Sequence, residues 1–319
     1  MHIVLTGGNG FIGRMLLKKM KTHPVLGESG HLITLIGRRF ETEIEDSRVR
    51  TVIGNLTDAD VVAQAFDPAP DVVIHLAALG SAESETDFDL GMQVNLHGTL
   101  GLLDALRQRG NKARFVFSSS IAVYGGPLPS PVTDDTPAVP GISYGAEKLA
   151  TEVLLRDYTR RGWVEGVALR LSGILARPAM RTTAGSAFWS DFLRTVAEGR
   201  PYVLPVSADA RLWAMSWQAC VDNLFHAALM PRGRPGEPTA YMLPALHTGV
   251  RDMIDALVEL YGPQVRDLVT CQADERTQRI YGSYPPLALK AAEADGFVGD
   301  ADTVTLVRRS LEGIVPPAG

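Results

Sequence analysis

Residues 6–17 read TGGNGFIGRMLL and continue the apolar run HIVLTG at residues 2–7. The glycines of this stretch have the spacing GxxGxxG, and the third opens a helical pattern. After a strand, the first glycine permits a tight turn, the second lets the backbone approach a pyrophosphate, and the third permits close helix packing. The stretch therefore predicts a dinucleotide site, with the diphosphate on N–H groups at the helix N-terminus. A glycine-rich turn without a ligand is the alternative.

The first half of the chain alternates short apolar runs with helical patterns. The runs are rich in Val, Ile and Leu and are bounded by Gly, Asn or Asp, which is typical of buried strands. We expect strands at 2–7, 32–37, 50–54, 71–78, 113–120 and 164–171, and helices at 13–22, 58–66, 94–110 and 143–162. This alternation predicts an α/β fold, a Rossmann-type doubly wound parallel sheet covered on both faces.

The pattern changes after Arg170. Prolines, glycines and tryptophans become frequent, and the alternation is lost until two late helical patterns at 250–262 and 286–297. We therefore predict a dinucleotide-binding domain at 1–170 and a smaller, mainly substrate-binding region at 171–319. Part of 213–232 is expected to return to the first domain.

Composition and charge exclude several classes of function. The chain has 319 residues and a net charge of −5, which gives no electrostatic footprint for nucleic acid. Cys220 and Cys271 are isolated, form no metal-ligand spacing and read as reduced thiols. No apolar run approaches the length of a membrane span, and the start reads as a strand and turn rather than a signal peptide. We expect a cytoplasmic protein without a metal, nucleic-acid or membrane partner.

The end of the second strand is where NAD and NADP are distinguished. An acidic residue there accepts the ribose 2′-OH of NAD, whereas an arginine accommodates the 2′-phosphate of NADP. The sequence LIGRRFETE places Arg38 and Arg39 first and Glu41 only later. Guanidinium groups bind phosphate well, so the sequence favours NADP. Alternatively, one arginine caps the strand and the ribose meets neither.

Further cofactor candidates follow other strands. Asn55 comes after the third strand, a suitable place for an adenine contact through its side chain or the backbone at Leu56. Small residues end the fourth strand, whose His75 reads as a core histidine. Besides the two arginines, the expected cofactor contacts are Gly7, Asn9, Gly10, Phe11, Ile12, Gly13, Asn55, Leu56, Ala77, Ala78, Tyr144 and Lys148.

The stretch YGAEK puts Tyr144 and Lys148 one turn apart on one face of a predicted helix. The serine-rich end of the fifth strand, SSSIAVYGG, reaches the carboxyl edge of the sheet, where ligands bind in such folds. An ammonium group there favours phenolate over phenol and makes Tyr144 a general base. The alternative is a tyrosine packed in the core and a solvated lysine.

The motifs TGGNGFIG, HLAA, VNLHGT, SSSIAVYGG and YGAEK, in this order, resemble those of the extended short-chain dehydrogenase/reductase family. That family includes nucleotide-sugar epimerases and dehydratases, and the resemblance extends to about Arg170. It implies catalytic roles for Ser120, Tyr144 and Lys148, and a role for Asn95 in holding backbone and water near the active site. It also implies a homodimer built on two helices, although the apolar stripes LLDALRQ and LATEVLLRDY could equally pack on the sheet.

The second half departs from the sugar-nucleotide members of that family. The segments 170–194 and 274–297 are similar to the D-erythronate dehydrogenase branch, which oxidises a small polyhydroxy acid at a secondary alcohol. This branch is expected to use NAD, in conflict with the inference from the arginines.

Arginines past the sixth strand could pair bidentately with a substrate carboxylate. Arg177 could instead form an interdomain salt bridge, and Trp213 could either exclude water from the substrate or belong to the core. The substrate candidates are Ser81, Ser120, Tyr144, Arg177, Arg181 and Ser186.

These observations predict an NAD(P)-dependent oxidoreductase. It would transfer a hydride between the nicotinamide and a secondary alcohol or ketone of a small polyhydroxy acid such as D-erythronate, with Tyr144 as general acid/base. The alternative is a nucleotide-sugar epimerase or dehydratase with tightly bound NAD(P). A dinucleotide-sensing regulator is a non-enzymatic alternative, but such sensors generally lose the Tyr–Lys pair that this chain keeps.

Overall fold

The computed structural model describes residues 1–23, 30–40, 44–176, 185–231 and 237–315. The chain divides into two compact units. Unit 1 consists of Met1–Gly126, Ala138–Arg170 and Asn223–Tyr241, and unit 2 of Pro127–Pro137, Leu171–Asp222 and Met242–Gly319. The division at Arg170 drawn from the sequence therefore differs from these units at Pro127–Pro137, which belongs to unit 2. Unit 1 includes Asn223–Tyr241, whereas part of 213–232 was expected to return to the first domain.

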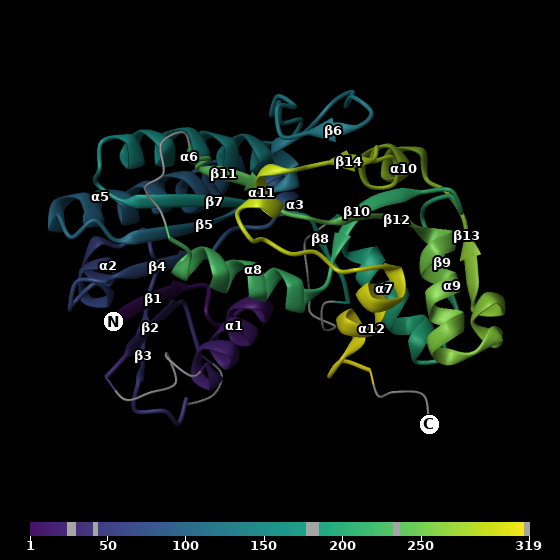
Figure 1. Cartoon of the computed structure of the whole chain (residues 1–319), viewed down its shortest axis with the longest axis horizontal. Coiled ribbons are helices and arrows are strands. Elements are labelled where there is room, and N and C mark those ends of the chain that lie inside the picture. The colour runs from purple at the N-terminus through teal and green to yellow at the C-terminus, as the bar shows by residue number, and fades with distance from the viewer. Residues whose placement is uncertain (24–29, 41–43, 177–184, 232–236, 316–319) are drawn as a thin grey trace. The chain divides into compact units, whose positions relative to one another are not determined.

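Unit 1 is built on a seven-stranded sheet with the order β11-β7-β5-β4-β1-β2-β3 (Figure 1). The strands are β1 (His2–Thr6), β2 (Leu32–Gly37), β3 (Val49–Ile53), β4 (Val72–His75), β5 (Arg114–Ser120), β7 (Glu165–Leu171) and β11 (Ala240–Met242). Strands β1 to β5 pair in parallel. The predicted Rossmann-type parallel sheet is confirmed, with β11 as a short strand that the sequence did not reveal.

The strand order places the topological switch at β1. From β1 the chain builds β2 and β3 on one side and β4, β5 and β7 on the other. In register, Thr6 of β1 lies beside His75 of β4, which in turn lies beside Phe117 of β5. The segments that follow these three residues therefore leave the sheet at one edge, the edge where such folds bind ligands.

Helices cover both faces of this sheet (Figure 1). They are α1 (Phe11–Thr22), α2 (Ala59–Ala65), α3 (Ser81–Thr86), α4 (Phe88–Gly91), the π-helix η1 (Met92–His97), α5 (Gly98–Arg109), the 3-10 turn η2 (Ile121–Val123) and α6 (Ser143–Arg160). One apolar cluster packs α2, α5 and α6 against the strands through residues such as Val62, Leu103 and Leu155. The stripe LLDALRQ thus belongs to the core of unit 1, which was one of its two interpretations.

The helix predicted at 94–110 begins earlier and is not uniform. Helix α4 precedes it, and the six residues of η1 are π-helical before α5 begins at Gly98. Hydrophobic periodicity does not distinguish a π turn from an α turn over so short a length.

Unit 2 combines small sheets with helices. Its strands are β6 (Val132–Thr133), β8 (Gly173–Ile174), β9 (Tyr202–Leu204), β10 (Arg211–Met215), β12 (Leu246–Gly249), β13 (Val269–Cys271) and β14 (Leu287–Ala288), which form the sheets β12-β10-β8, β13-β9 and β14-β6. Its helices are α7 (Ala187–Ala197), α9 (Val250–Tyr261), the 3-10 helix η3 (Pro263–Leu268), α10 (Glu275–Tyr281), α11 (Ala291–Ala294) and α12 (Thr303–Leu311). Helix α8 (Trp217–Leu229) begins in unit 2 and ends in unit 1.

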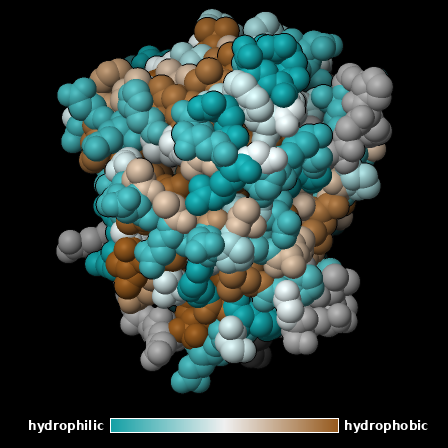
Figure 2. Space-filling model, turned by 90° about the vertical axis from the view of Figure 1, so that its left-hand side faces the viewer, coloured by the Kyte–Doolittle hydropathy of each residue, from teal (hydrophilic) through white to brown (hydrophobic). Residues whose placement is uncertain are grey.

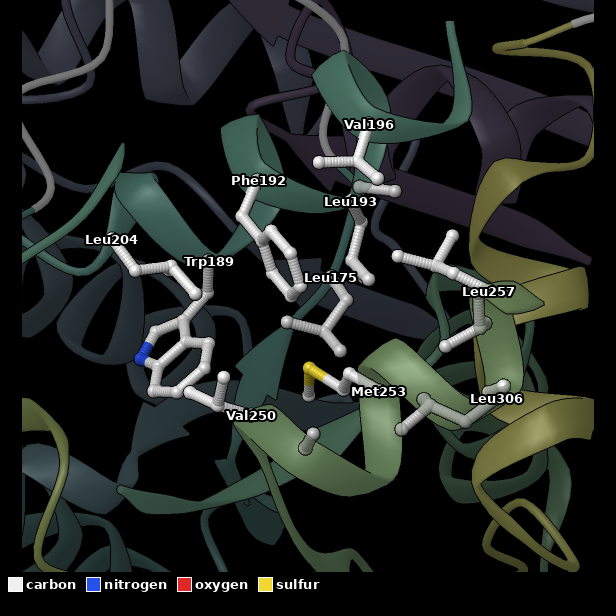
Figure 3. Packing of buried hydrophobic residues seen from close by; sticks show 14 of the residues in the cluster. Leu175, Trp189, Phe192, Leu193, Val196, Leu204, Val250, Met253, Leu257 and Leu306 are labelled. Carbon is white, nitrogen blue, oxygen red and sulfur yellow. The ribbon is translucent and has the colours of Figure 1, made fainter. Parts of the chain in front are cut away.

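Apolar side chains from α7, α9 and α12 form the core of unit 2 (Figure 3). Phe192 and Leu193 point from α7 toward Met253 and Leu257 on α9, and Leu306 closes the cluster from α12 (Figure 3). This core explains the helical pattern at 250–262, which was predicted correctly.

The helix predicted at 286–297 is mostly wrong. Strand β14 occupies its start, and only Ala291–Ala294 is helical. The Asp134 carboxylate accepts hydrogen bonds from the backbone N–H groups of Lys290 and Ala291, at 2.8 and 3.2 Å. This long-range contact fixes where α11 begins, and no local pattern reveals it.

Hydrophilic side chains alternate with separate hydrophobic areas on the face that Figure 2 shows. The larger exposed apolar side chains include Phe88 and Leu90 on α4 and Val153 on α6. None of the helices in the described ranges is long and apolar enough to span a bilayer.

Candidate active site

The glycine loop is held by backbone packing that leaves no room for side chains. Gly7 has a φ of +70°, and a Cβ there would lie 2.8 Å from the backbone nitrogen of Ala77. A Cβ at Gly13 would overlap the carbonyl oxygen of Gly7. Gly10 donates its N–H to that same carbonyl at 2.9 Å. The loop therefore needs glycine at 7 and 13 to bring β1, α1 and the end of β4 together.

Helix α1 begins in a way that suits an anion. Its N-cap, Gly10, offers no side-chain hydrogen bond, and its first turn has no acidic residue. By contrast, α2 is capped by Asp58, whose carboxylate accepts from the N–H of Asp60. The first turn of a helix carries N–H groups without helical partners and a partial positive charge. The start of α1 therefore fits the diphosphate of a dinucleotide.

The segment after β2 is tied to the glycine loop. The side-chain amide of Asn9 donates to the carbonyl oxygen of Arg39 at 2.8 Å. Arg38 and Arg39 are both exposed and follow the carboxyl end of β2. Glu41 lies outside the described residues.

The adenine candidates follow β3. Asn55 is exposed and accepts from the N–H of Thr57 at 3.2 Å, while Leu56 is buried. Phe11 and Ile12 are half-buried in the first turn of α1, and Ala77 and Ala78 follow β4. All of these belong to unit 1.

His75 is a buried core histidine between two threonines. Its Nδ1 lies 2.6 Å from the hydroxyl of Thr6, and its Nε2 lies 2.8 Å from the hydroxyl of Thr99. Because the Thr99 hydroxyl donates to the carbonyl of Asn95, it accepts from Nε2–H. Burial, together with the charge of Lys148, lowers the pKa of His75 to about 3. The ring is therefore a neutral link between β1, β4 and α5.

Lys148 is buried beside Tyr144. It is only 1% exposed, and its Nζ donates to the carbonyl oxygen of Ser118 at 2.8 Å. The same nitrogen lies 4.6 Å from the ring centroid of Phe117 and 5.4 Å from that of Tyr144. The solvated lysine that was the alternative is thus excluded. Burial lowers the pKa of Lys148 to about 8, against the opposing charges of Glu147 and Glu152.

Ser120 ends β5, and its hydroxyl oxygen accepts from the N–H of Ala122 at 3.1 Å. The turn that follows packs against the start of α6. A Cβ at Gly145 would overlap the carbonyl oxygen of Ala122. This close backbone contact joins the turn after Ser120 to the residue after Tyr144.

Asn95 lies in the π-helix η1 and is buried. Its side-chain oxygen accepts from the N–H of Leu79 at 2.7 Å, and its Nδ2 donates to Glu147 at 2.6 Å and to Leu79 O at 3.3 Å. Asn95 therefore holds the backbone just before Ser81, which opens α3 and is half-buried.

Sequence reasoning missed three charged residues around this group. Glu152 pairs with Arg170 at 2.7 Å and accepts from the hydroxyl of Ser119. Arg170 also donates to the Tyr124 hydroxyl at 2.7 Å. Glu147 is described above. The available signal was position, since Glu147 precedes Lys148 and Glu152 follows it by one helical turn.

The remaining substrate candidates lie beyond Arg170. Arg177 and Arg181 fall outside the described residues. Ser186 immediately precedes α7 in unit 2 and is half-buried. Trp213 is fully buried and donates its indole N–H to the carbonyl of Pro285 at 2.6 Å, so it belongs to the core. In the described part of the chain, no group of three His, Cys, Asp or Glu residues is arranged to hold a metal ion.

Two named dehydrogenases resemble this chain over nearly its full length. The D-erythronate dehydrogenase of Cupriavidus necator is 38% identical over 318 residues, with 98% of each chain covered. The D-erythronate dehydrogenase of Haemophilus influenzae is 32% identical over 316 residues, with 98% of this chain and 99% of the relative covered.

A solved structure has the same fold. The nucleoside-diphosphate-sugar epimerase from Agrobacterium tumefaciens is 34% identical, with a TM-score of 0.91 over 98% of this chain and 94% of that chain.

The sequence profile of the NAD dependent epimerase/dehydratase family matches residues 3–213. The match begins in β1 and ends in β10, so it spans the glycine loop, Asn95, Ser120, Tyr144 and Lys148. The family resemblance read from the motifs is confirmed, and the protein is an enzyme of the NAD dependent epimerase/dehydratase family.

Proposed function

We propose that the protein is a dehydrogenase that oxidises a secondary alcohol of a small polyhydroxy acid such as D-erythronate, with Tyr144 as general acid/base. The observation that carries the chemistry is the buried Lys148 ammonium beside Tyr144. The near-full-length similarity to two D-erythronate dehydrogenases supports the substrate class, because it includes the second half of the chain.

A bound nicotinamide cofactor supplies the hydride acceptor for the alcohol carbon. Tyr144 takes the proton of the substrate hydroxyl. Lys148 favours the phenolate form of Tyr144 because an ammonium within a few ångströms stabilises a neighbouring anion. Ser120, at the end of β5, hydrogen-bonds the substrate oxygen as its charge changes. For the substrate itself we propose contacts with Ser81, Ser186, Arg177 and Arg181, the last two outside the described residues.

The cofactor residues proposed are the glycine loop, Asn55, Leu56, Ala77 and Ala78 in unit 1. The exposed Arg38 and Arg39 support NADP, since two guanidinium groups follow β2 where a 2′-phosphate is bound in such folds. The bond from Asn9 to Arg39 supports this assignment by fixing the backbone between loop and arginine.

Nicotinamide absorbance tests both assignments. Purified protein is mixed with D-erythronate, its stereoisomers and related hydroxy acids, each with NAD and with NADP. We expect reduction with one acid and higher kcat/KM with NADP. A clear preference for NAD would remove Arg38 and Arg39 from cofactor choice. If no acid in the panel reduces the cofactor although cofactor binding is demonstrated, the proposal of a small-acid substrate is contradicted.

Tyr144→Phe tests the proton transfer. The variant should lose about 10²–10⁴-fold in kcat, the usual contribution of a positioned acid/base, and should still bind cofactor. Tyr158→Phe is the matched control, because it removes a phenol hydroxyl from the same helix where that hydroxyl donates to Asp104. Unchanged turnover in Tyr144→Phe would remove Tyr144 from the mechanism.

Epimerisation of a nucleotide sugar is the second candidate, favoured by the likeness to the Agrobacterium epimerase structure. An epimerase regenerates its cofactor in each cycle. Cofactor retained through purification, with substrate conversion and no net change in absorbance, would favour it over the dehydrogenase.

We also propose a homodimer built on α5 and α6, which carry the stripes LLDALRQ and LATEVLLRDY. Val153 of the second stripe is 50% exposed, and both helices belong to unit 1. Light scattering should give twice the chain mass of 34.4 kDa, and a monomeric mass would contradict the assignment.

A further inference from the structure

Glu147 is a buried carboxylate inside the YGAEK motif. It is 2% exposed, and its Oε2 accepts from the amide of Asn95 at 2.6 Å. Its Oε1 has no hydrogen-bond partner among the described residues. That oxygen lies 2.5 Å from the place where a Cβ on Gly91 would stand, so only glycine at this position leaves room for it.

The burial of the Glu147 carboxylate is energetically unfavourable. Burying a charge with one oxygen unsatisfied is unfavourable by several kcal/mol unless another charge compensates. The amide oxygen of a glutamine could also accept the Asn95 hydrogen bond, without that penalty. The hydrogen bond alone therefore does not explain the negative charge.

A buried cation, Lys148, is the next residue on α6. Burial disfavours the ammonium form of Lys148 and lowers its pKa. Two carboxylates oppose this effect, and Glu147 opposes it more strongly than Glu152 does. The other, Glu152, already forms a salt bridge with Arg170. Glu147 and Lys148 are consecutive on α6 and both are buried, so little solvent screens one charge from the other.

We propose that Glu147 is a positioning residue that keeps Lys148 in its ammonium form and anchors Asn95 against the Leu79 backbone. This inference rests on the proposed roles of Tyr144 and Lys148. Glu147 touches neither substrate nor cofactor in this assignment and acts through its two neighbours.

The π-helix makes this arrangement possible. Gly91 and Asn95 lie at either end of the transition from α4 into η1, and both meet the Glu147 carboxylate. A π turn widens the helix and displaces the side chains that follow it, and such turns are frequent at functional sites. Ser84 of α3 accepts from the same Asn95 amide at 3.1 Å and completes the surroundings.

Several other titratable groups surround this pair and must be accounted for. On α6 they are Tyr144 and Glu152, on β4 the neutral His75, and on β7 Arg170, which neutralises Glu152. The acidic side chains of α3 and α4, which also pack on this part of α6, are exposed to solvent: Glu83, Glu85 and Asp89. Solvent screens these exposed charges, whereas Glu147 and Lys148 are both buried.

Glu147→Gln separates charge from hydrogen bonding, because the amide oxygen still accepts from Asn95. Lysine labelled with ¹³C at Cε reports the titration of Lys148 by NMR, assigned by its loss in Lys148→Arg. We expect the midpoint of Lys148 to fall by about one pH unit in Glu147→Gln. Glu165→Gln is the control, since that glutamate pairs with Arg114 in the same unit, and it should leave the midpoint unchanged.

Enzyme kinetics provides the second readout. The alkaline limb of the pH profile of kcat/KM for alcohol oxidation should move to lower pH in Glu147→Gln. In Glu147→Asp, which keeps the charge, this limb should lie close to its wild-type position. An unchanged Lys148 midpoint would overturn the inference. The NMR titration needs no turnover, so it stands apart from the Tyr144→Phe test: full activity in Tyr144→Phe contradicts the proposed function instead.

Discussion

The two units bury very different side chains. Unit 1 buries His75, Asn95, Glu147, Lys148 and Glu152 around the end of its sheet. The core of unit 2 is an apolar cluster of leucine, valine and aromatic residues (Figure 3). Unit 2 also buries a carboxylate, Asp300, but this one accepts from the backbone and hydroxyl of Ser216 and pairs with Arg309.

The difference indicates that the buried polar groups of unit 1 serve chemistry, whereas the apolar core of unit 2 serves stability. Buried charges whose partners are incomplete are poor sources of stability and are common at functional sites. The buried side chains of the unit 2 cluster carry no ionisable group. We therefore expect changes in the buried polar groups of unit 1 to alter activity and pH behaviour as well as stability, and changes in the unit 2 core to alter stability alone.

Arg170→Met should give the largest effect. It leaves Glu152 buried without its cation, which typically destabilises by about 3–5 kcal/mol. Urea unfolding measures the loss in free energy of unfolding. The control Arg160→Met removes an exposed partner of Asp157 and should change stability by about 1 kcal/mol or less. Equal effects from both variants would break the comparison, because the buried pair would then behave like a surface one.

Leu257→Ala should destabilise by about 2–5 kcal/mol through the cavity it leaves in unit 2. Val203→Ala, at a side chain that is 56% exposed, serves as the matched control and should have little effect. Under conditions where Leu257→Ala remains folded, its cofactor Kd should equal that of the wild type. A weakened Kd would show that the two roles are not separate.

His75 makes unit 1 sensitive to acid. Its pKa is about 3 in the folded protein and about 6.5 when unfolded, so only the unfolded state binds the proton between these values. Stability is therefore lost as pH falls from 6.5 toward 3, by about 2 kcal/mol at pH 5. In His75→Gln this part of the loss between pH 7 and pH 5 should disappear in urea titrations. A variant as acid-sensitive as the wild type would assign the loss to other groups.

Local sequence patterns were sufficient to predict an element wherever the interactions that determine it lie close together in the chain. The six long strands and the glycine loop follow from apolar runs and from backbone geometry at Gly7 and Gly13. The short strand β11, the π turn η1 and the start of α11 were not predictable. Strand β11 pairs with β7 and α11 starts at a bond to Asp134, both far along the chain, while periodicity does not distinguish η1 from an α turn.

The candidate site shows the same limit. Tyr144 and Lys148 could be identified from their spacing, but the burial of Lys148 and its bond to Ser118 required the fold. Glu147 was in the quoted motif and passed unnoticed, because its role depends on Asn95, 52 residues away. Which substrate group meets Arg177 or Arg181 stays a prediction.

The overlap that any side chain at Gly145 would create with the Ala122 carbonyl has a consequence for engineering this enzyme. The spacing between Ser120 and Tyr144 is set by main chain against main chain, which no repacking of side chains can adjust. We therefore expect directed evolution toward new substrates to tolerate almost no change at position 145. New specificity is therefore expected from changes at other positions, with the proposed catalytic residues Ser120 and Tyr144 kept in place.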